Sequence, residues 1–119
     1  RVALARTLAQ GRDVLLLDEP FAALDAITRM ELQLWLEGIW EAQRPTVILI
    51  THDVREAVLL SDRIYVLSDR PAHIVGEFEV PLERPRTIDM LAGAKATQLE
   101  LELLRALQVG AGPTEPIPG

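Results

Sequence analysis

The sequence predicts an α/β protein in which helices flank a parallel β-sheet. Two unbroken apolar runs, VLLL at 14–17 and TVILIT at 46–51, have the pattern of strands buried on both faces. Amphipathic segments lie between and after them, and this alternation of strand and helix favours right-handed βαβ units. Hydrophobic residues make up 49% of the chain but aromatic residues only 4%, which agrees with a core of Leu, Val, Ile and Ala.

Composition and charge exclude several classes of function. The 119 residues suffice for one small domain, and 18 acidic against 12 basic residues give a net charge of −6. No cluster of Lys and Arg occurs, so we expect no nucleic-acid partner. The chain has no cysteine, which excludes disulfides and thiolate metal sites. It begins at Arg1 within a helical pattern, without a start Met or signal peptide, and we therefore expect a truncated chain.

Two helices are predicted in the first part of the chain. The first covers 1–10, where apolar residues recur at helical spacing before Gly11. The second is a long amphipathic helix at 25–42, with Asp25 as the cap of its amino end. Its apolar face is expected to contain Ile27, Met30, Leu34 and Trp35, and its water-facing side Glu31, Gln33 and Glu37.

The remaining elements follow from caps and turn signals. Asp53 and Glu56 form a variant of the capping box, which predicts a helix from there to about Ser61. Two further strands are predicted on either side of an Asp-Arg-Pro turn signal. The predicted bounds are 63–68 and 73–80 for these strands, 81–86 for an irregular segment, 96–108 for a terminal helix and 110–119 for a frayed tail.

Three polar side chains, Asp18, Glu19 and His52, follow the two apolar strands at their carboxyl ends, where ligands of parallel sheets bind. Asp18 could hold Mg²⁺ beside a triphosphate, and Glu19 could orient or deprotonate an attacking water. Neighbouring strand ends would bring His52 close enough to donate a hydrogen bond to a terminal phosphate oxygen. An acidic pair after a strand is also typical of caps and solvated loops, and a histidine of loop packing, so both interpretations stay open here.

Three segments together resemble the ATPases of the ATP-binding-cassette (ABC) family. VLLLDEPFAALDAITR is similar to the Walker B motif and D-loop, and ITHDVREAVLLSDRIYVLS to the switch-histidine segment. RVALARTLA resembles the helix that follows the signature motif. The resemblance covers residues 1 to about 86, and it implies a partial P-loop NTPase fold with 87–109 as a helical extension and 110–119 as a flexible tail.

The resemblance implies a role for each site residue. Asp18 would be the Walker B aspartate serving Mg²⁺, and Glu19 the general base of ATP hydrolysis. His52 would be the switch histidine that contacts the γ-phosphate and the attacking water. Ala22 to Asp25 would form the D-loop near the partner's nucleotide, and Ala22 departs from the Ser or Gly that usually opens this loop.

The phosphate-binding motifs of the family are absent from these residues. No GxxxxGK[ST] occurs, and the single lysine, Lys95, follows AGA and precedes Ala96. The adenine-stacking aromatic, the Q-loop and the glycine-rich signature are absent too. Without the backbone N–H cradle of a P-loop, we expect the isolated chain to bind ATP poorly and to be inactive as an ATPase.

The phrases DEPFAALDAITR, THDVREAVLLSDR and VPLERPR are similar to importers of nitrate, sulfonate or taurine. This resemblance implies a homodimer, or a pair with a second ABC subunit, formed through the D-loop. It also implies an integral membrane permease as partner and a peripheral position on the cytoplasmic face of the inner membrane. Two alternatives stay open: a soluble cassette ATPase of DNA repair or translation, and a non-catalytic truncated fragment.

Overall fold

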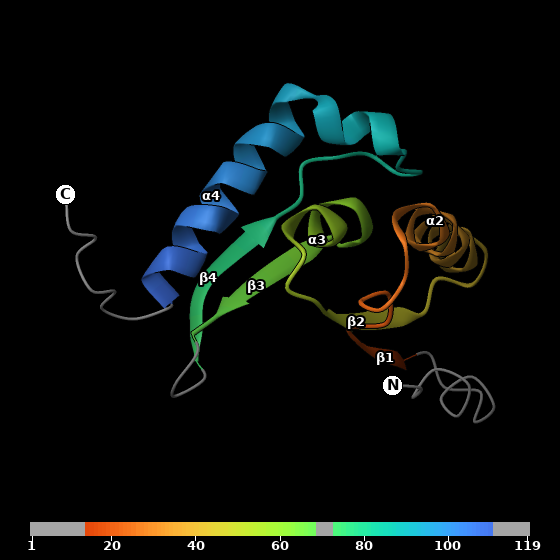
Figure 1. The fold of residues 1–119 in the computed structure, drawn as a ribbon, viewed down its shortest axis with the longest axis horizontal. Helices are drawn as coiled ribbons and strands as arrows, with labels where there is room; N and C mark the ends of the chain where they lie inside the picture. The colour runs from red at the N-terminus through yellow and green to blue at the C-terminus, as the bar shows by residue number, and fades with distance from the viewer. Residues whose placement is uncertain (1–13, 69–72, 111–119) are drawn as a thin grey trace.

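The computed structural model describes residues 14–68 and 73–110, and Figure 1 shows their arrangement. The predicted helix at 1–10 and nearly all of the predicted tail lie outside the described residues. In chain order the elements are β1 (Val14–Asp18), α2 (Ala26–Gln43), β2 (Thr46–Ile50), α3 (Val54–Leu60), β3 (Arg63–Leu67), β4 (Ile74–Glu79), the 3₁₀ helix η1 (Ile88–Ala92) and α4 (Ala94–Gly110). The helix α3 lies between α2 on one side and α4 on the other (Figure 1).

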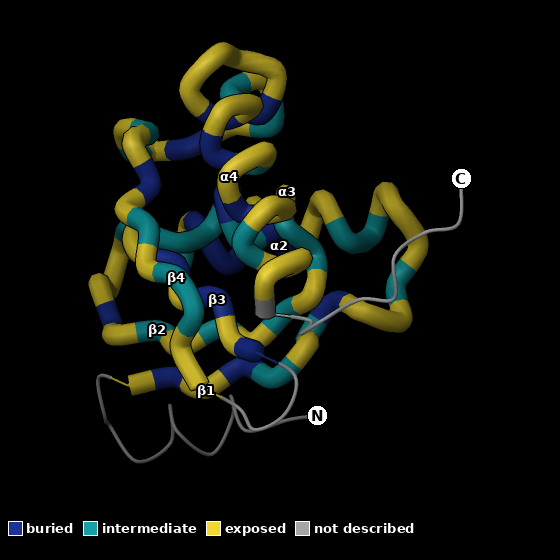
Figure 2. Tube along the Cα trace, turned by 90° about the vertical axis from the view of Figure 1, so that its left-hand side faces the viewer, coloured by how far each residue is buried: buried dark blue, intermediate teal, exposed yellow. Residues whose placement is uncertain are grey.

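The strands β1 and β2 form the predicted parallel pair, with a register that runs from Val14 opposite Thr46 to Asp18 opposite Ile50. Buried and exposed residues alternate along β1 (Figure 2). Leu15 and Leu17 are buried, and Leu17 packs with Leu36 of α2. The residues on the opposite face of the pair are 44–52% exposed; they are Val14, Leu16, Ile48 and Ile50. The prediction that these strands are buried on both faces is therefore wrong for the described residues.

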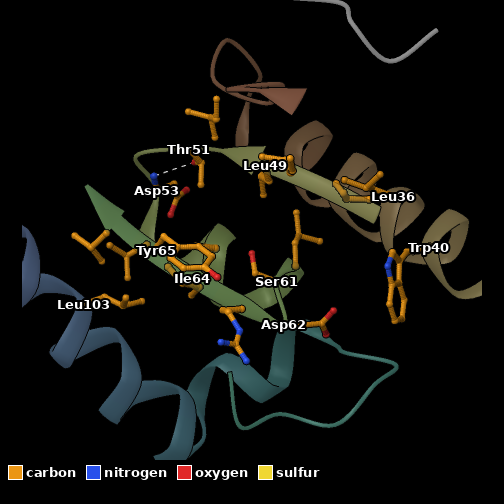
Figure 3. A pocket seen from close by; sticks show the side chains of 18 of the residues that line it. Leu36, Trp40, Leu49, Thr51, Asp53, Ser61, Asp62, Ile64, Tyr65 and Leu103 are labelled. Carbon is orange, nitrogen blue, oxygen red and sulfur yellow. Dashed lines mark hydrogen bonds between the residues drawn. The ribbon is translucent and has the colours of Figure 1, made fainter. Parts of the chain in front are cut away.

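The strand β3 does not extend the parallel pair, which corrects the expectation of a second βαβ unit. It pairs with β4 in an antiparallel hairpin with an irregularity at Val66 and Leu67. A cavity of about 930 Å³, lined by every residue of β2 and of β3, separates the two strands. Figure 3 looks into this cavity, with Leu49 and Thr51 on the β2 side and Ile64 and Tyr65 on the β3 side. Because the cavity intervenes, β2 and β3 do not hydrogen-bond to each other.

The main core lies between the hairpin and the helices α3 and α4. The helix α4 packs one face on this core, so the predicted terminal helix is confirmed with slightly wider bounds. The buried members of the core are Val58, Leu59, Ile64, Val66, Val80, Leu91, Ala96, Leu99 and Leu103.

The helix α2 is confirmed, but the prediction of its buried face is wrong. Ile27, Met30, Leu34 and Trp35 are 37–65% exposed, whereas Gln33, Leu36 and Glu37 are buried. Gln33 donates a hydrogen bond from Nε2 to Oε1 of Glu56 on α3 at 2.9 Å, and Glu37 accepts from Arg84. Burial of these polar groups is tolerated because each has a partner.

Arg84 joins three parts of the chain. Its guanidinium donates to both carboxylate oxygens of Glu37 at 2.6 Å, to Asp62 at 2.9 Å and to the carbonyl of Leu60 at 2.8 Å. It also stacks on Trp40, 4.1 Å from the ring centroid. Burial works to lower the pKa of Arg84, but the hydrogen bonds to Glu37 and Asp62 outweigh it and leave the pKa above its ordinary value. The segment predicted as irregular thus contributes an ion pair and hydrogen bonds that connect α2 to the carboxyl end of α3.

Arg86 closes the carboxyl end of α3. It is 3% exposed and donates to the carbonyls of Val58 at 3.2 Å and Ser61, and to Leu82 at 3.1 Å. Burial, together with the neighbouring charge of Arg84, lowers the pKa of Arg86. These bonds satisfy carbonyls that a helix end leaves without intrahelical partners.

We predict that Arg84→Ala destabilises the chain by about 3–5 kcal/mol, because Glu37 would stay buried without its partner. Equilibrium urea unfolding followed by circular dichroism measures the loss. The double variant Arg84→Met with Glu37→Leu removes both charges and is expected to lose less than the single variant. Equal losses in the two variants would show that the unpaired carboxylate is not the cause.

Candidate active site

The register of β1 and β2 brings two distant parts of the chain together at the carboxyl ends of the strands. Asp18 lies opposite Ile50, and the N–H of Glu19 donates to the carbonyl of Ile50 at 2.7 Å. His52 follows two residues later, and its Nδ1 lies 2.6 Å from Oε1 of Glu19. The predicted proximity of the imidazole to the carboxylates is therefore present, across 33 residues of sequence.

Glu19 has a backbone conformation that the sequence does not reveal. Its φ is +47°, in the left-handed region that residues other than glycine rarely adopt. This conformation takes Glu19 out of the alternation of β1, and the turn that follows is closed by bonds from Ala22 N–H to the Glu19 carbonyl and from Leu24 N–H to the Phe21 carbonyl. Strain of this kind costs on the order of 1–3 kcal/mol and often marks a functional position.

Hydrogen bonds hold the residues that flank His52 in the loop after β2. Asp53 N–H donates to Oγ1 of Thr51 at 3.0 Å. The Asp53 carboxylate accepts from the N–H groups of Arg55 at 3.0 Å and Glu56 at 3.3 Å, which confirms Asp53 as the cap of α3. The side chain of His52 itself is 79% exposed and that of Glu19 is 44% exposed. Backbone hydrogen bonds therefore fix the segments that carry Glu19 and His52, while the two side chains stay accessible to a ligand.

A small pocket of about 210 Å³ surrounds the pair, large enough for a few water molecules. The pocket contains the carboxylate and the imidazole, which contact each other, and the guanidinium of Arg29 also lines it. Its lining consists of Glu19, Phe21, Ala22, Arg29, Thr51, His52, Asp53 and Glu56. Such an arrangement can accept a proton from a water and orient that water at the same time.

The two other predicted site residues lie outside this pocket. Asp18 is half-buried, at the end of the β1 face that it shares with Val14 and Leu16. Asp25 caps α2 as predicted, accepting from Thr28 N–H at 3.2 Å. Hydrogen bonding to the side chain of Thr28, and secondly to its backbone N–H, lowers the pKa of Asp25. Within the described ranges, no group of three or more His, Cys, Asp or Glu side chains is arranged to hold a metal ion.

Sequence reasoning missed Arg29, which lines the pocket. It lies four residues after the cap Asp25, so it projects from the first turn of α2 toward the loop before the helix. Its spacing from the cap was the available signal, because side chains of the first turn lie beside the segment that enters a helix. Glu56 was also assigned only as part of a cap, and the structure shows it buried in the pocket wall.

The described residues form an α/β protein in which the ends of adjacent parallel strands carry a carboxylate and an imidazole in contact. No protein-family model matches the chain. The nitrate import ATP-binding protein NrtD of Synechococcus elongatus is 49% identical over 106 residues, which are 87% of this chain and 39% of that protein. The aliphatic sulfonates import ATP-binding protein SsuB 3 of Nocardia farcinica is 47% identical over 109 residues, 92% of this chain and 42% of that protein.

An uncharacterized ABC transporter ATP-binding protein of Methanocaldococcus jannaschii is 55% identical over 86 residues, 72% of this chain and 32% of that protein. The chain belongs to the ABC ATP-binding protein family. It spans 32–42% of the length of these relatives. Within residues 14–68 and 73–110, no helix has the length and apolar character needed to cross a membrane.

We predict that Glu19→Gly leaves the chain more stable than Glu19→Ala by about 1–2 kcal/mol, because glycine adopts the left-handed conformation without a Cβ clash. Both variants lose the contact with His52, so the comparison isolates the backbone. Urea unfolding of the two variants measures the difference. An alanine variant that is the more stable of the two would contradict the strained conformation.

Proposed function

We propose that this chain forms part of the ATPase subunit of an ABC importer, in which Glu19 and His52 act on the water that attacks ATP. The observation that carries the proposal is the 2.6 Å contact between Glu19 and His52 at the ends of paired parallel strands. The names of the relatives support it, because two of them are import ATP-binding proteins.

Each residue of the pair has a definite task in this proposal. Glu19 accepts the proton of the attacking water, and its carboxylate contacts His52 in the loop after β2. In the imidazolium form of His52, Nδ1 donates to Glu19 while Nε2 is left to donate to a terminal phosphate oxygen. The exposed imidazole can therefore orient the phosphate relative to the water.

The residue for Mg²⁺ in this proposal is Asp18. Proteins usually hold Mg²⁺ by one or two carboxylates together with waters and substrate phosphates, so a single aspartate at a strand end fits. When bound, the ion supplies positive charge against the triphosphate. Asp18 directly precedes Glu19 in the sequence and ends β1, outside the pocket that Glu19 and His52 line. The D-loop, Ala22 to Asp25, lies near the nucleotide held by the partner subunit in this proposal, and Asp25 binds that nucleotide.

The phosphate cradle has to come from residues outside this chain. No P-loop motif occurs in the 119 residues, and the relatives are more than twice as long. The cavity of about 930 Å³ between β2 and β3 is the place where a further strand fits, since both strands present an edge to it. We propose that residues outside the chain supply this strand and join the two small sheets into one.

Partners and location follow from the same proposal. Two such subunits, or one with a second ABC subunit, associate through the D-loop and drive an integral membrane permease from the cytoplasmic face of the inner membrane. Residues 1–86 belong to the ATPase domain, and 87–109 form its helical extension. A small anion such as nitrate or a sulfonate is the proposed cargo, as the names of the relatives suggest.

We predict that Glu19→Gln in the full-length protein lowers ATP hydrolysis by on the order of 10²–10⁴-fold, because the amide cannot accept the proton of the attacking water. Binding of ATP should stay intact, since the phosphate cradle lies elsewhere. Steady-state hydrolysis and equilibrium nucleotide binding test the two parts separately. Glu31→Gln, on the exposed side of α2, is the matched control and should leave turnover unchanged. Normal turnover in Glu19→Gln would remove Glu19 as the base.

His52→Ala in the full-length protein is expected to slow hydrolysis by at least about 10²-fold, the range for a lost group that stabilises charge or transfers a proton. The effect should fall on kcat, because the imidazole acts on the reacting groups. Hydrolysis rates at saturating ATP measure it. A variant with nearly normal turnover would defeat the role of the histidine.

A further inference from the structure

The guanidinium of Arg29 lies where three segments of the candidate site meet. Its Nε donates to the carbonyl of Phe21 at 3.2 Å, and one terminal nitrogen donates to the carbonyl of Leu24 at 3.1 Å. The other terminal nitrogen lies 3.7 Å from Oδ2 of Asp53. The side chain is 33% exposed, so these contacts are partly shielded from water.

The first two contacts fix the path of the chain after Glu19. Phe21 and Leu24 belong to the turn that leaves the strained residue, and they are already joined by the bond from Leu24 N–H to the Phe21 carbonyl. From the first turn of α2, Arg29 donates hydrogen bonds to the backbone carbonyls of these two residues. Because a left-handed Glu19 persists only where its surroundings over-determine it, this anchoring is part of what keeps its carboxylate in place.

The third contact reaches the residue after His52. Asp53 caps α3, so its carboxylate is already held by two backbone N–H groups of that helix. One turn further along α2, Gln33 donates to the buried Glu56, three residues after Asp53. Arg29 and Gln33 are thus successive contacts between one face of α2 and the first turn of α3. They set the position of α3, and with it that of the loop that carries His52.

We infer that Arg29 is a positioning residue for the Glu19–His52 pair, one that holds the turn after Glu19 and the cap after His52 in a fixed relation. This inference rests on the proposed function of the pair. All three guanidinium nitrogens face protein oxygens, so Arg29 acts through the loops and does not touch the reacting atoms. The planar fork of arginine suits this task, because it presents several donors in a rigid plane, whereas lysine is a single point charge.

The test compares Arg29→Ala and Arg29→Lys with Arg44→Ala in the full-length protein. Arg44 is the matched control, since it is an arginine at the far end of α2 that pairs with Glu41 and stacks on Trp40. We expect kcat for ATP hydrolysis to fall by on the order of 10- to 10²-fold in both Arg29 variants, as a misplaced catalytic group does. The KM for ATP should change by less than about 2-fold, because the phosphate cradle lies elsewhere. Arg44→Ala should keep the kcat of the wild type.

A second readout does not depend on hydrolysis. In protein labelled with ¹⁵N-histidine, the ring signals of His52 are assigned by their loss in His52→Gln. They are expected to move in Arg29→Ala and Arg29→Lys and to stay in place in Arg44→Ala. Thermal unfolding of each variant separates positioning from a general loss of stability, and the lysine variant keeps the test valid if the alanine variant does not fold.

The inference would be overturned by unchanged kcat, by unchanged His52 signals or by full rescue by lysine. A fall in kcat that merely follows the folded fraction would also overturn it, because it would show a structural role alone. Failure of the proposed function looks different. In that case wild-type protein fails to hydrolyse ATP, or Glu19→Gln hydrolyses it normally, while the His52 signals still respond to Arg29.

Discussion

The arrangement of the site depends on the in-register parallel pairing of β1 and β2. A register shift of one residue would turn each side chain to the other face of the sheet and move the strand ends apart. With Asp18 opposite Ile50, the next residue of each strand lies at the same edge, and the bond from Glu19 N–H to the Ile50 carbonyl closes the ladder. The contact between Glu19 and His52 follows from this pairing together with the left-handed backbone of Glu19.

Polar contacts, together with the packing of Leu36 against Leu17 and Phe21, connect α2 to the rest of the structure. Gln33 and Glu37 are buried against Glu56 and Arg84, while apolar residues of the same helix are exposed. Buried polar pairs require defined geometry, and when fully satisfied they favour a single arrangement of the elements that they join. The helix therefore holds the loops at its amino end in a specific orientation, and Arg29 extends this row of contacts to the site.

The sequence predicted that Glu19 and His52 lie close together, because local signals such as strand ends and caps are encoded within a few residues. Asp53 caps α3, Asp25 caps α2, and the two apolar runs pair in parallel as predicted. The buried face of α2 could not be predicted, because Gln33 and Glu37 depend on Glu56 and Arg84, which lie 23 and 47 residues away. The separation of β3 from β2 could not be predicted either, because local sequence signals do not show which strand lies beside β3. Contacts between residues far apart in sequence leave no mark on the local hydrophobic pattern.

In the proposed function, this chain carries the water-activating half of an ATPase site, and the phosphate-binding half lies outside it. Isothermal titration calorimetry with Mg-ATP, on the 119-residue chain and on the full-length protein under the same conditions, tests it most directly. We expect micromolar binding by the full-length protein and no measurable heat of binding with the chain alone. Micromolar binding by the chain alone would contradict it, because it would place a phosphate cradle among residues that contain no P-loop.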